Sequence, residues 1–334
     1  MNNTDGVAVV TGGSAGLGRA IVREFALRGW DVAVIARGRE GVDGAVRDVR
    51  AAGQRGIGLL ADVSQRDQLD AAAETIEREL GPIAVWVNNA MTSVFGEFAS
   101  TDPDDFERVV QVDFFGFVNG TRTAMKHLKA HNAGAIIQVG SALAHRGIPL
   151  QAAYCSSKHA ITGFTESVLT ELLHDKSPLT ISQVDMPAMN TMQFDWVKSQ
   201  LPEHPQPVPP IYQPEICAAV VVDTAERPRR RTWVGESTVV TIIGNRVASR
   251  YADHAVAKSG YSGQEADWLK ERMLPPNLYE PVAGDHGAHG AFDSKSLRIT
   301  PQTWAIRHRG LVRNLGLAVL ALAASATVAA ARRR

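Results

Sequence analysis

Short apolar runs alternate with helical patterns along most of this chain, and no other feature restricts the possible folds as much. Six runs recur, each followed by a helical pattern or a loop: VAVV, VAVIA, IGLLA, IAVWV, AIIQV and LTISQV. Apolar strands without a regular polar alternation are buried on both faces. The pattern therefore predicts a parallel sheet with helices above and below it.

This arrangement is a three-layer, doubly wound α/β domain, or Rossmann fold, which we place at residues 4–250. Residues 201–214 contain six prolines, which exclude a helix or a central strand and predict a loop that could serve as a lid. Over residues 251–310 the periodicity weakens and Gly and His become frequent, so we expect an irregular C-terminal extension. Residues 311–334 form a hydrophobic, Arg-flanked tail.

Charge and cysteine content exclude several classes of protein. Lys plus Arg and Asp plus Glu both number 35, so nothing indicates a nucleic-acid partner. The run Arg229–Arg231 is predicted to be solvated. Cys155 and Cys217 offer neither a disulfide framework nor a zinc-ligand spacing. Because the N-terminus also lacks a secretory signal, we expect a cytoplasmic protein.

The stretch TGGSAGLG lies between the first predicted strand and a helix predicted over residues 17–28. A glycine-rich turn in this context lets the backbone approach a pyrophosphate, which then lies at a helix N-terminus that favours anions. Gly12, Gly16 and Gly18 have the spacing G-x-x-x-G-x-G, which differs from the common G-x-G-x-x-G fingerprint. The motif predicts a dinucleotide site, and a tight turn without a ligand is the alternative.

Tyr154 and Lys158 are four residues apart in AAYCSSKHAITGF, a segment with a helical pattern. Residues at this spacing are neighbours on a helix surface. A cation at Lys158 would therefore stabilise a phenolate at Tyr154 and lower the tyrosine pKa. An isolated pair of this kind is more often a half-buried tyrosine beside a solvated lysine. Other motifs of the chain are therefore needed to distinguish this interpretation from a catalytic pair.

Together these motifs resemble the short-chain dehydrogenase/reductase family, in the branch marked by T-G-x-x-x-G-x-G. The resemblance covers about residues 4–235 and includes Ser141, which precedes Tyr154 by thirteen residues as the family's serine does. It implies hydride transfer between a nicotinamide and a carbonyl or alcohol carbon, with Tyr154 as general acid or base. The implied catalytic residues are Ser141, Tyr154, Lys158 and Asp113. The implied cofactor-binding residues are Thr11, Gly12, Ser14, Gly16, Leu17, Gly18, Arg37, Asp62, Val63, Asn89, Ala90, Tyr154, Lys158 and Thr191.

Two residues depart from the family pattern. Asp113 stands where the family has an asparagine that holds a helix irregularity and a water in a proton relay. Aspartate keeps the main-chain carbonyl, but its side chain cannot donate a hydrogen bond when ionised, so we expect an altered relay. Met91 replaces the glycine of N-N-A-G, and its flexible apolar side chain should crowd or line the site, with ordinary packing as the alternative.

Cofactor choice is predicted from the end of the second strand. Ala36 stands where an acidic residue would accept a hydrogen bond from the ribose 2′-hydroxyl of NAD. Arg37 follows it, and a guanidinium pairs well with a 2′-phosphate, so the family pattern favours NADP, with NAD the less favoured choice. Arg39 could assist. Two surface arginines in a loop are the alternative interpretation.

The resemblance implies a substrate pocket after the fourth, fifth and sixth strands. We assign Met91, Leu143, His145 and Met189 to it, and further candidates are Val94, Phe95, Met186, Met192 and Phe194. An apolar, methionine-rich pocket suits a small lipophilic ketone, aldehyde or secondary alcohol. His145 is more often a packing histidine than a second base in such a position.

The tail raises a separate question. Residues 315–331 are seventeen uncharged, mostly apolar residues between Arg313 and Arg332, which is the lower limit for a spanning helix. A bilayer span, an interfacial helix and a helix docked on protein all remain open. We expect membrane association through this tail, and a homo-oligomer. His286 and His289 have no ligand cluster beside them that would predict a metal.

Two hypotheses therefore compete. The first is an NADP-dependent oxidoreductase that acts on a lipophilic carbonyl or alcohol. The second is a cofactor-binding sensor or scaffold at a membrane, in which Asp113 and Met91 have weakened catalysis. The complete set of Ser141, Tyr154 and Lys158 favours the first.

Overall fold

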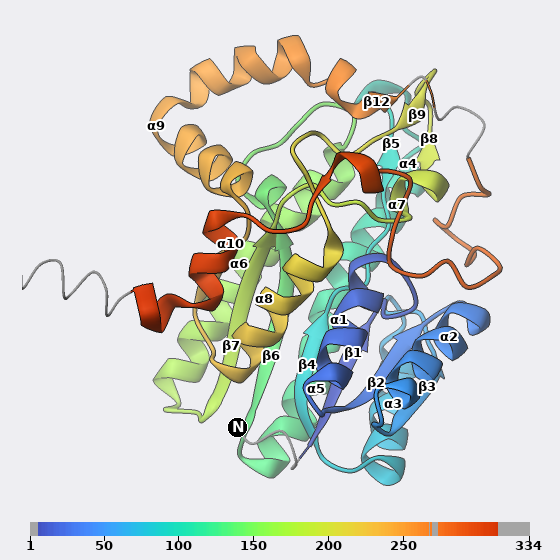
Figure 1. Cartoon of the computed structure of the whole chain (residues 1–334), viewed down its shortest axis with the longest axis vertical. Coiled ribbons are helices and arrows are strands. Elements are labelled where there is room, and N and C mark those ends of the chain that lie inside the picture. The colour runs from blue at the N-terminus through green and yellow to red at the C-terminus, as the bar shows by residue number, and fades with distance from the viewer. Residues whose placement is uncertain (1–5, 267, 269–272, 313–334) are drawn as a thin grey trace, which may run out of the picture.

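The six apolar runs form six strands of one parallel sheet in the computed structural model, which describes residues 6–266, 268 and 273–312. A seventh strand lies at the sheet edge, and the strand order is β11-β7-β6-β4-β1-β2-β3 (Figure 1). The strands are β1 (Val7–Thr11), β2 (Asp31–Ala36), β3 (Gly56–Leu60), β4 (Ile83–Asn88), β6 (Gly134–Ser141), β7 (Leu179–Met186) and β11 (Arg231–Trp233).

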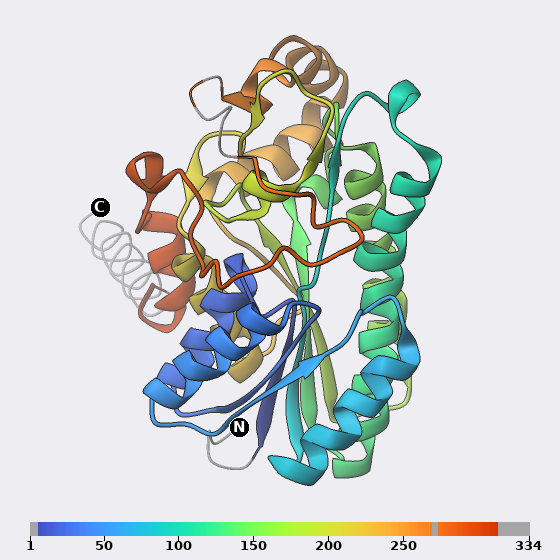
Figure 2. The same ribbon diagram turned by 90° about the vertical axis from the view of Figure 1, so that its right-hand side faces the viewer.

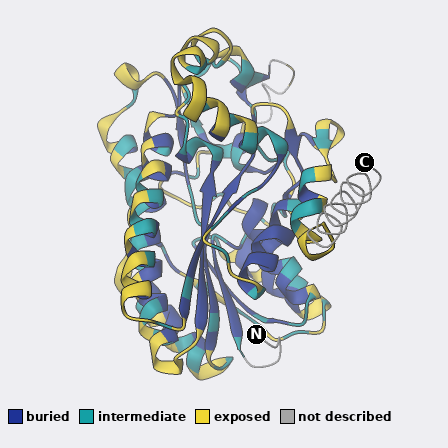
Figure 3. Cartoon of the chain, turned by 90° about the vertical axis from the view of Figure 1, so that its left-hand side faces the viewer, coloured by how far each residue is buried: buried dark blue, intermediate teal, exposed yellow. Residues whose placement is uncertain are grey.

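Helices cover both faces of the sheet, which confirms the predicted three-layer α/β fold (Figures 1 and 2). On one face lie α1 (Gly16–Leu27), α2 (Arg39–Ala51) and α8 (Pro214–Glu226), and on the other α3 (Arg66–Glu79), α4 (Pro103–Val110), α5 (Gly116–His131) and α6 (Ala152–His174). Successive residues of β1 alternate between the two cores, since Ala8 and Val10 pack on one face and Val7 and Val9 on the other. The strands are thus buried on both sides, and exposure is concentrated on the outer helix surfaces (Figure 3).

The short edge strand β11 was not predicted. It pairs with β7, with Thr232 opposite Val184. It consists of only three residues and begins with the last arginine of the run Arg229–Arg231, so no apolar pattern indicates it. The prediction that this whole run is solvated is wrong for Arg231, because its side chain is only 16% exposed and its guanidinium lies 3.3 Å from Glu166.

A π-helical turn, Gln111–Phe115, joins α4 to α5 and contains Asp113. One long helix therefore carries an irregularity at its middle. Such π-turns are rare and occur frequently at functional sites. The turn places Asp113 in the protein interior, where the residue has no exposed surface.

The remaining elements lie mainly above the carboxyl ends of the strands. They are β5 (Val94–Phe95), α7 (Gln193–Trp196), β8 (Lys198–Ser199), β9 (His204–Pro205), β10 (Ile211–Tyr212), α9 (Glu236–Ser259), β12 (Glu265–Ala266), β13 (Ser296–Leu297) and α10 (Pro301–Arg307). The proline-rich segment 201–214 is mostly without regular structure, as predicted. α9 crosses the predicted domain boundary at residue 250 and is kinked close to it, at Ala248, where φ is −140° and ψ is 51°. The boundary stays a prediction.

Within the described residues, no helix has the length and apolar character that crossing a bilayer requires. The tail 315–331, on which the prediction of membrane association rests, lies outside those residues. That prediction and the expected homo-oligomer stay predictions.

Candidate active site

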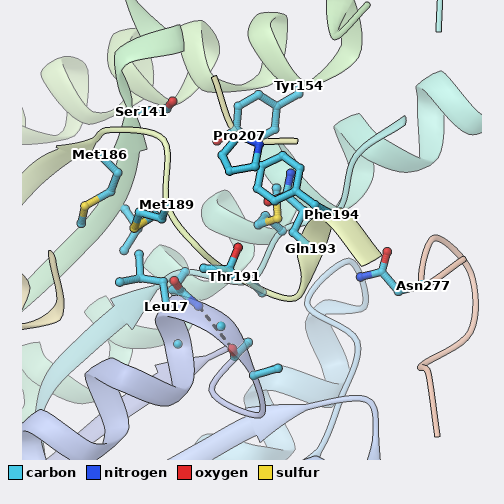
Figure 4. Close-up of a pocket in the computed structure, with 18 of the residues that line it drawn as sticks. Leu17, Ser141, Tyr154, Met186, Met189, Thr191, Gln193, Phe194, Pro207 and Asn277 are labelled. Atoms are coloured by element: carbon cyan, nitrogen blue, oxygen red, sulfur yellow. Dashed lines mark hydrogen bonds between the residues drawn. The ribbon is translucent and has the colours of Figure 1, made fainter. Parts of the chain in front are cut away.

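A cavity of about 470 Å³ lies at the carboxyl ends of the strands. In open α/β sheets this edge is where ligands bind, because loops from several strands converge there. Most of the predicted cofactor residues line the cavity, as do Ser141, Tyr154 and Lys158. Figure 4 shows residues from distant parts of the chain around this space, among them Leu17, Ser141, Tyr154, Thr191 and Asn277.

The glycine-rich loop between β1 and α1 has a backbone conformation that residues with side chains would not readily adopt. Gly12 and Gly16 have φ values of +64° and +56°, in the left-handed region that favours glycine. A Cβ at Gly18 would lie 2.0 Å from the Gly12 carbonyl oxygen. The first turn of α1 contains no acidic residue and no side-chain cap. This helix N-terminus therefore suits the pyrophosphate of a dinucleotide.

Thr11 has a supporting position behind the cavity rather than in its wall. Its hydroxyl oxygen accepts a hydrogen bond from the Asn89 backbone N–H at 3.0 Å, and the Asn89 side-chain amide donates to the Thr11 carbonyl, also at 3.0 Å. These bonds fasten the end of β4 to the end of β1. Thr11 therefore positions Asn89 and Ala90, which do line the cavity.

The predicted catalytic residues meet at one side of the cavity. The Ser141 hydroxyl accepts a hydrogen bond from the Leu143 backbone N–H at 3.1 Å. Lys158 is 2% exposed, its Nζ donates to the Val139 carbonyl at 3.1 Å, and it lies 5.5 Å from the centre of the Tyr154 ring. The i, i+4 spacing on α6 thus brings the lysine beside the phenol.

The pKa values of Tyr154 and Lys158 differ from those expected for a phenol beside a charged lysine. Burial raises the pKa of Tyr154 above its ordinary value, and a hydrogen bond with Ser141 offsets this only in part. Burial also lowers the pKa of Lys158, although Asp113 and Asp185 act in the opposite direction. The pKa of Tyr154 is therefore not lowered overall in the protein without its cofactor, because the desolvation of the phenol is the largest effect.

Asp113 lies behind the catalytic residues and does not line the cavity. One carboxylate oxygen, Oδ1, accepts a hydrogen bond from the Thr92 backbone N–H at 2.8 Å. The other, Oδ2, is buried and has no hydrogen-bond partner among the described residues. Burial raises the pKa of Asp113 to about 7, against the attraction of Lys158. The carboxyl group therefore holds a proton over part of the neutral range, when it can donate as asparagine does.

Arg37 lines the cavity but is bound differently from the prediction. Its guanidinium donates to three carbonyls of the C-terminal extension: those of Leu278 at 3.3 Å, Tyr279 at 2.6 Å and Asn277. These contacts arise because the extension returns to the end of β2, which the sequence pattern does not indicate. The pairing of Arg37 with a 2′-phosphate stays a prediction.

The predicted substrate residues divide into two groups. Met91, Leu143, Met186, Met189 and Phe194 line the cavity. His145 does not, and its assignment to the pocket is wrong.

The His145 imidazole Nε2 lies 2.9 Å from the buried carboxylate of Asp185, and its ring packs edge-on against Trp233. It therefore belongs to the packing around β11. Val94, Phe95 and Met192 also lie outside the cavity wall, and the first two pack in separate apolar clusters.

Comparison with known proteins decides the family. The sequence profile described as short chain dehydrogenase matches residues 6–200. This chain belongs to the short-chain dehydrogenase family. The predicted family is thereby confirmed, and the protein is an NAD(P)-dependent oxidoreductase.

Relatives of this short-chain dehydrogenase occur in bacteria and animals. It is 31% identical over 284 residues to the uncharacterized oxidoreductase YxnA of Bacillus subtilis (strain 168), covering 84% of this chain and 80% of YxnA. The 17-beta-hydroxysteroid dehydrogenase 13 of Homo sapiens is 29% identical over 171 residues, covering 50% of this chain and 55% of that protein. A short chain dehydrogenase/reductase from Burkholderia phymatum, solved in complex with NAD, shares the fold with a TM-score of 0.68 and 21% identity, covering 75% of this chain and 97% of that one.

Several cavity residues of the short-chain dehydrogenase were not found from the sequence. Gln193, Trp196 and Pro207 come from the segment after β7, and the six prolines there were the signal that a loop covers the site. A second group comes from the C-terminal extension, for which the sequence carried no signal. These residues are Asn277, Pro281, Val282, Gly284 and His286.

Proposed function

We propose that this short-chain dehydrogenase transfers a hydride between NADP(H) and a lipophilic ketone, aldehyde or secondary alcohol, with Tyr154 as the general acid or base. One observation carries the proposal. Ser141, Tyr154 and Lys158 line the same cavity as the glycine-rich loop, and the remaining wall includes three methionines, Phe194 and Trp196.

Each catalytic side chain has a role that follows from its position. When bound, the nicotinamide supplies or accepts the hydride. The Ser141 hydroxyl donates a hydrogen bond to the substrate oxygen, where negative charge develops. Tyr154 gives that oxygen a proton in reduction and takes it back in oxidation. Lys158 provides the neighbouring positive charge that favours the phenolate after the proton has left.

The wall of the cavity supports a lipophilic substrate. Met186, Met189 and Phe194 line it together with Pro207 and Val208 of the proline-rich loop. Methionine side chains adapt to irregular hydrocarbon shapes, and the cavity volume is in the range of small-molecule sites. The names of two relatives add support, since the human protein and an estradiol 17-beta-dehydrogenase 11 of Mus musculus are both named for steroid alcohols.

The residues at the end of β2 favour NADP over NAD as the cofactor. Ala36 offers no carboxylate for a ribose 2′-hydroxyl, and Arg37 keeps a positive charge beside the cavity even though its N–H groups bind the extension. We expect kcat/KM with NADPH to exceed that with NADH by about tenfold or more, as one charge-assisted contact would give. Steady-state rates with one accepted ketone and both cofactors test this. Equal values would contradict the NADP preference and leave the oxidoreductase assignment intact.

Substrate class is tested with a series of 2-alkanones of increasing chain length and NADPH as reductant. Each methylene that is buried contributes about 0.8 kcal/mol, so kcat/KM should rise about threefold to fourfold per carbon until the cavity is filled. Short, water-soluble ketones of the same carbonyl reactivity serve as controls. A flat profile, or a preference for charged ketones, would contradict the lipophilic pocket.

A further inference from the structure

Residues 277–290, here called the strap, cross the cofactor-binding side of the molecule from the end of α4 to the loop after β7. In Figure 2 the strap belongs to the orange trace that passes above the blue α1 and α2. At its first end, Leu278 is 1% exposed and packs in a cluster with Val94, Val109 and Ala153. Arg37 and Arg108 both donate hydrogen bonds to the Leu278 carbonyl. This end is therefore firmly attached to the domain.

An ion pair joins the middle of the strap to α1, the helix that follows the glycine-rich loop. Asp285 lies 2.9 Å from the guanidinium of Arg19, a residue of α1 that is only 2% exposed. Arg19 also pairs with Asp48 of α2 at 2.6 Å, so one buried cation joins the strap to two helices. The contact is close, because a Cβ at Gly44 would lie 2.0 Å from the Asp285 carboxylate. A partly buried charge-assisted contact of this kind favours one geometry of the two segments.

The far end of the strap reaches both the phosphate-binding and the nicotinamide-binding parts of the predicted site. The Gly16 backbone N–H, at the start of α1, donates to the Gly287 carbonyl at 3.0 Å. Gly290 lies so close to the loop after β7 that a Cβ there would be 2.5 Å from the Thr191 carbonyl oxygen. The strap thus contacts the dinucleotide site along its length.

Four strap residues between these contacts line the cavity itself: Pro281, Val282, Gly284 and His286. We propose that the strap is the outer wall of the cofactor site and that the Asp285–Arg19 ion pair keeps this wall closed over the bound dinucleotide. The proposal rests on the proposed function, since it needs a dinucleotide in the cavity. It makes Asp285 a positioning residue, remote from the reacting atoms, that sets how fast the cofactor leaves.

The test compares cofactor release from the wild type, Asp285→Asn and the control Asp43→Asn. Asp43 is an exposed carboxylate on α2 that lies outside the cavity wall. We expect Asp285→Asn to raise the Kd for both NADPH and NADH by about tenfold, mainly through faster release in stopped-flow fluorescence. Hydrogen exchange of residues 278–288 should be slowed by the cofactor in the wild type and much less in the variant. The control should match the wild type.

Gly290→Ala provides a second, independent variant, because its added methyl group pushes the far end of the strap away without removing a charge. It should also speed release of both cofactors. Unchanged release rates in both variants, with a lower midpoint of thermal unfolding, would show that the ion pair only stabilises the fold and would overturn the strap proposal. A wild type that binds neither NADPH nor NADH would overturn the proposed function itself.

Discussion

Replacing Tyr154 by phenylalanine is expected to lower kcat/KM for ketone reduction by about 1,000-fold, within the range that general acid–base groups contribute. The substitution removes only the hydroxyl that transfers the proton. Lys158 and Ser141, which belong to α6 and β6, remain in place. The Kd for NADPH should therefore stay within about twofold of the wild-type value. Steady-state kinetics and a fluorescence titration of NADPH measure the two effects separately.

Tyr212→Phe is the matched control, because it also removes a hydroxyl from a buried tyrosine. Tyr212 lies in β10, is 1% exposed and donates to Glu236 at 3.1 Å, outside the cavity wall. Its loss should cost some stability but little activity. If Tyr154→Phe kept activity near that of the wild type, another group would be the proton donor.

Asp113→Asn is expected to change the pH dependence of stability. Burial raises the pKa of Asp113 from 3.8 to about 7, so the folded protein retains a proton that the unfolded chain has already lost between these values. The contribution of the Asp113 carboxyl group to the free energy of unfolding is therefore fully present below about pH 4. It decreases as the pH rises toward 7. Asparagine does not titrate. At pH 8 the variant should be more stable by an amount on the order of 2 kcal/mol, since the lost attraction to Lys158 offsets part of the gain.

Urea unfolding of both proteins at pH 5 and pH 8 measures this difference, and Asp43→Asn should show no such change. Activity should respond as well. The negative charge of Asp113 raises the pKa values of both Tyr154 and Lys158, so its removal should move the alkaline limb of the kcat/KM profile to lower pH. An inactive wild type that gained turnover on this substitution would instead mean that the carboxylate suppresses catalysis.

The sequence predicts the sheet well because its strands are buried on both faces and their apolar pattern is therefore strong. It misses β11, because an edge strand of three residues with an arginine at its start has no such pattern. The convergence of Ser141, Tyr154 and the glycine-rich loop was predictable, because strand ends in a parallel sheet meet at one edge.

Other features depend on contacts between distant segments. The sequence alone allows the ring of His145 to point toward the cavity or toward the sheet. In the structure its Nε2 lies beside the buried carboxylate of Asp185, which explains why the ring points toward the sheet. Likewise, the N–H groups of Arg37 bind carbonyls some 240 residues further along the chain. Local spacing contains no information about such partners.

The Arg19–Asp285 ion pair joins residues that are 266 positions apart, which has a consequence for how the protein is made. Synthesis proceeds from the N-terminus, so the central sheet and its helices are available for folding well before residue 285 leaves the ribosome. Until then the crevice lacks one wall, and closing so long a loop is among the slower steps of folding. On the strap proposal, we therefore expect a chain truncated before the strap to release the dinucleotide faster than the chain that contains it.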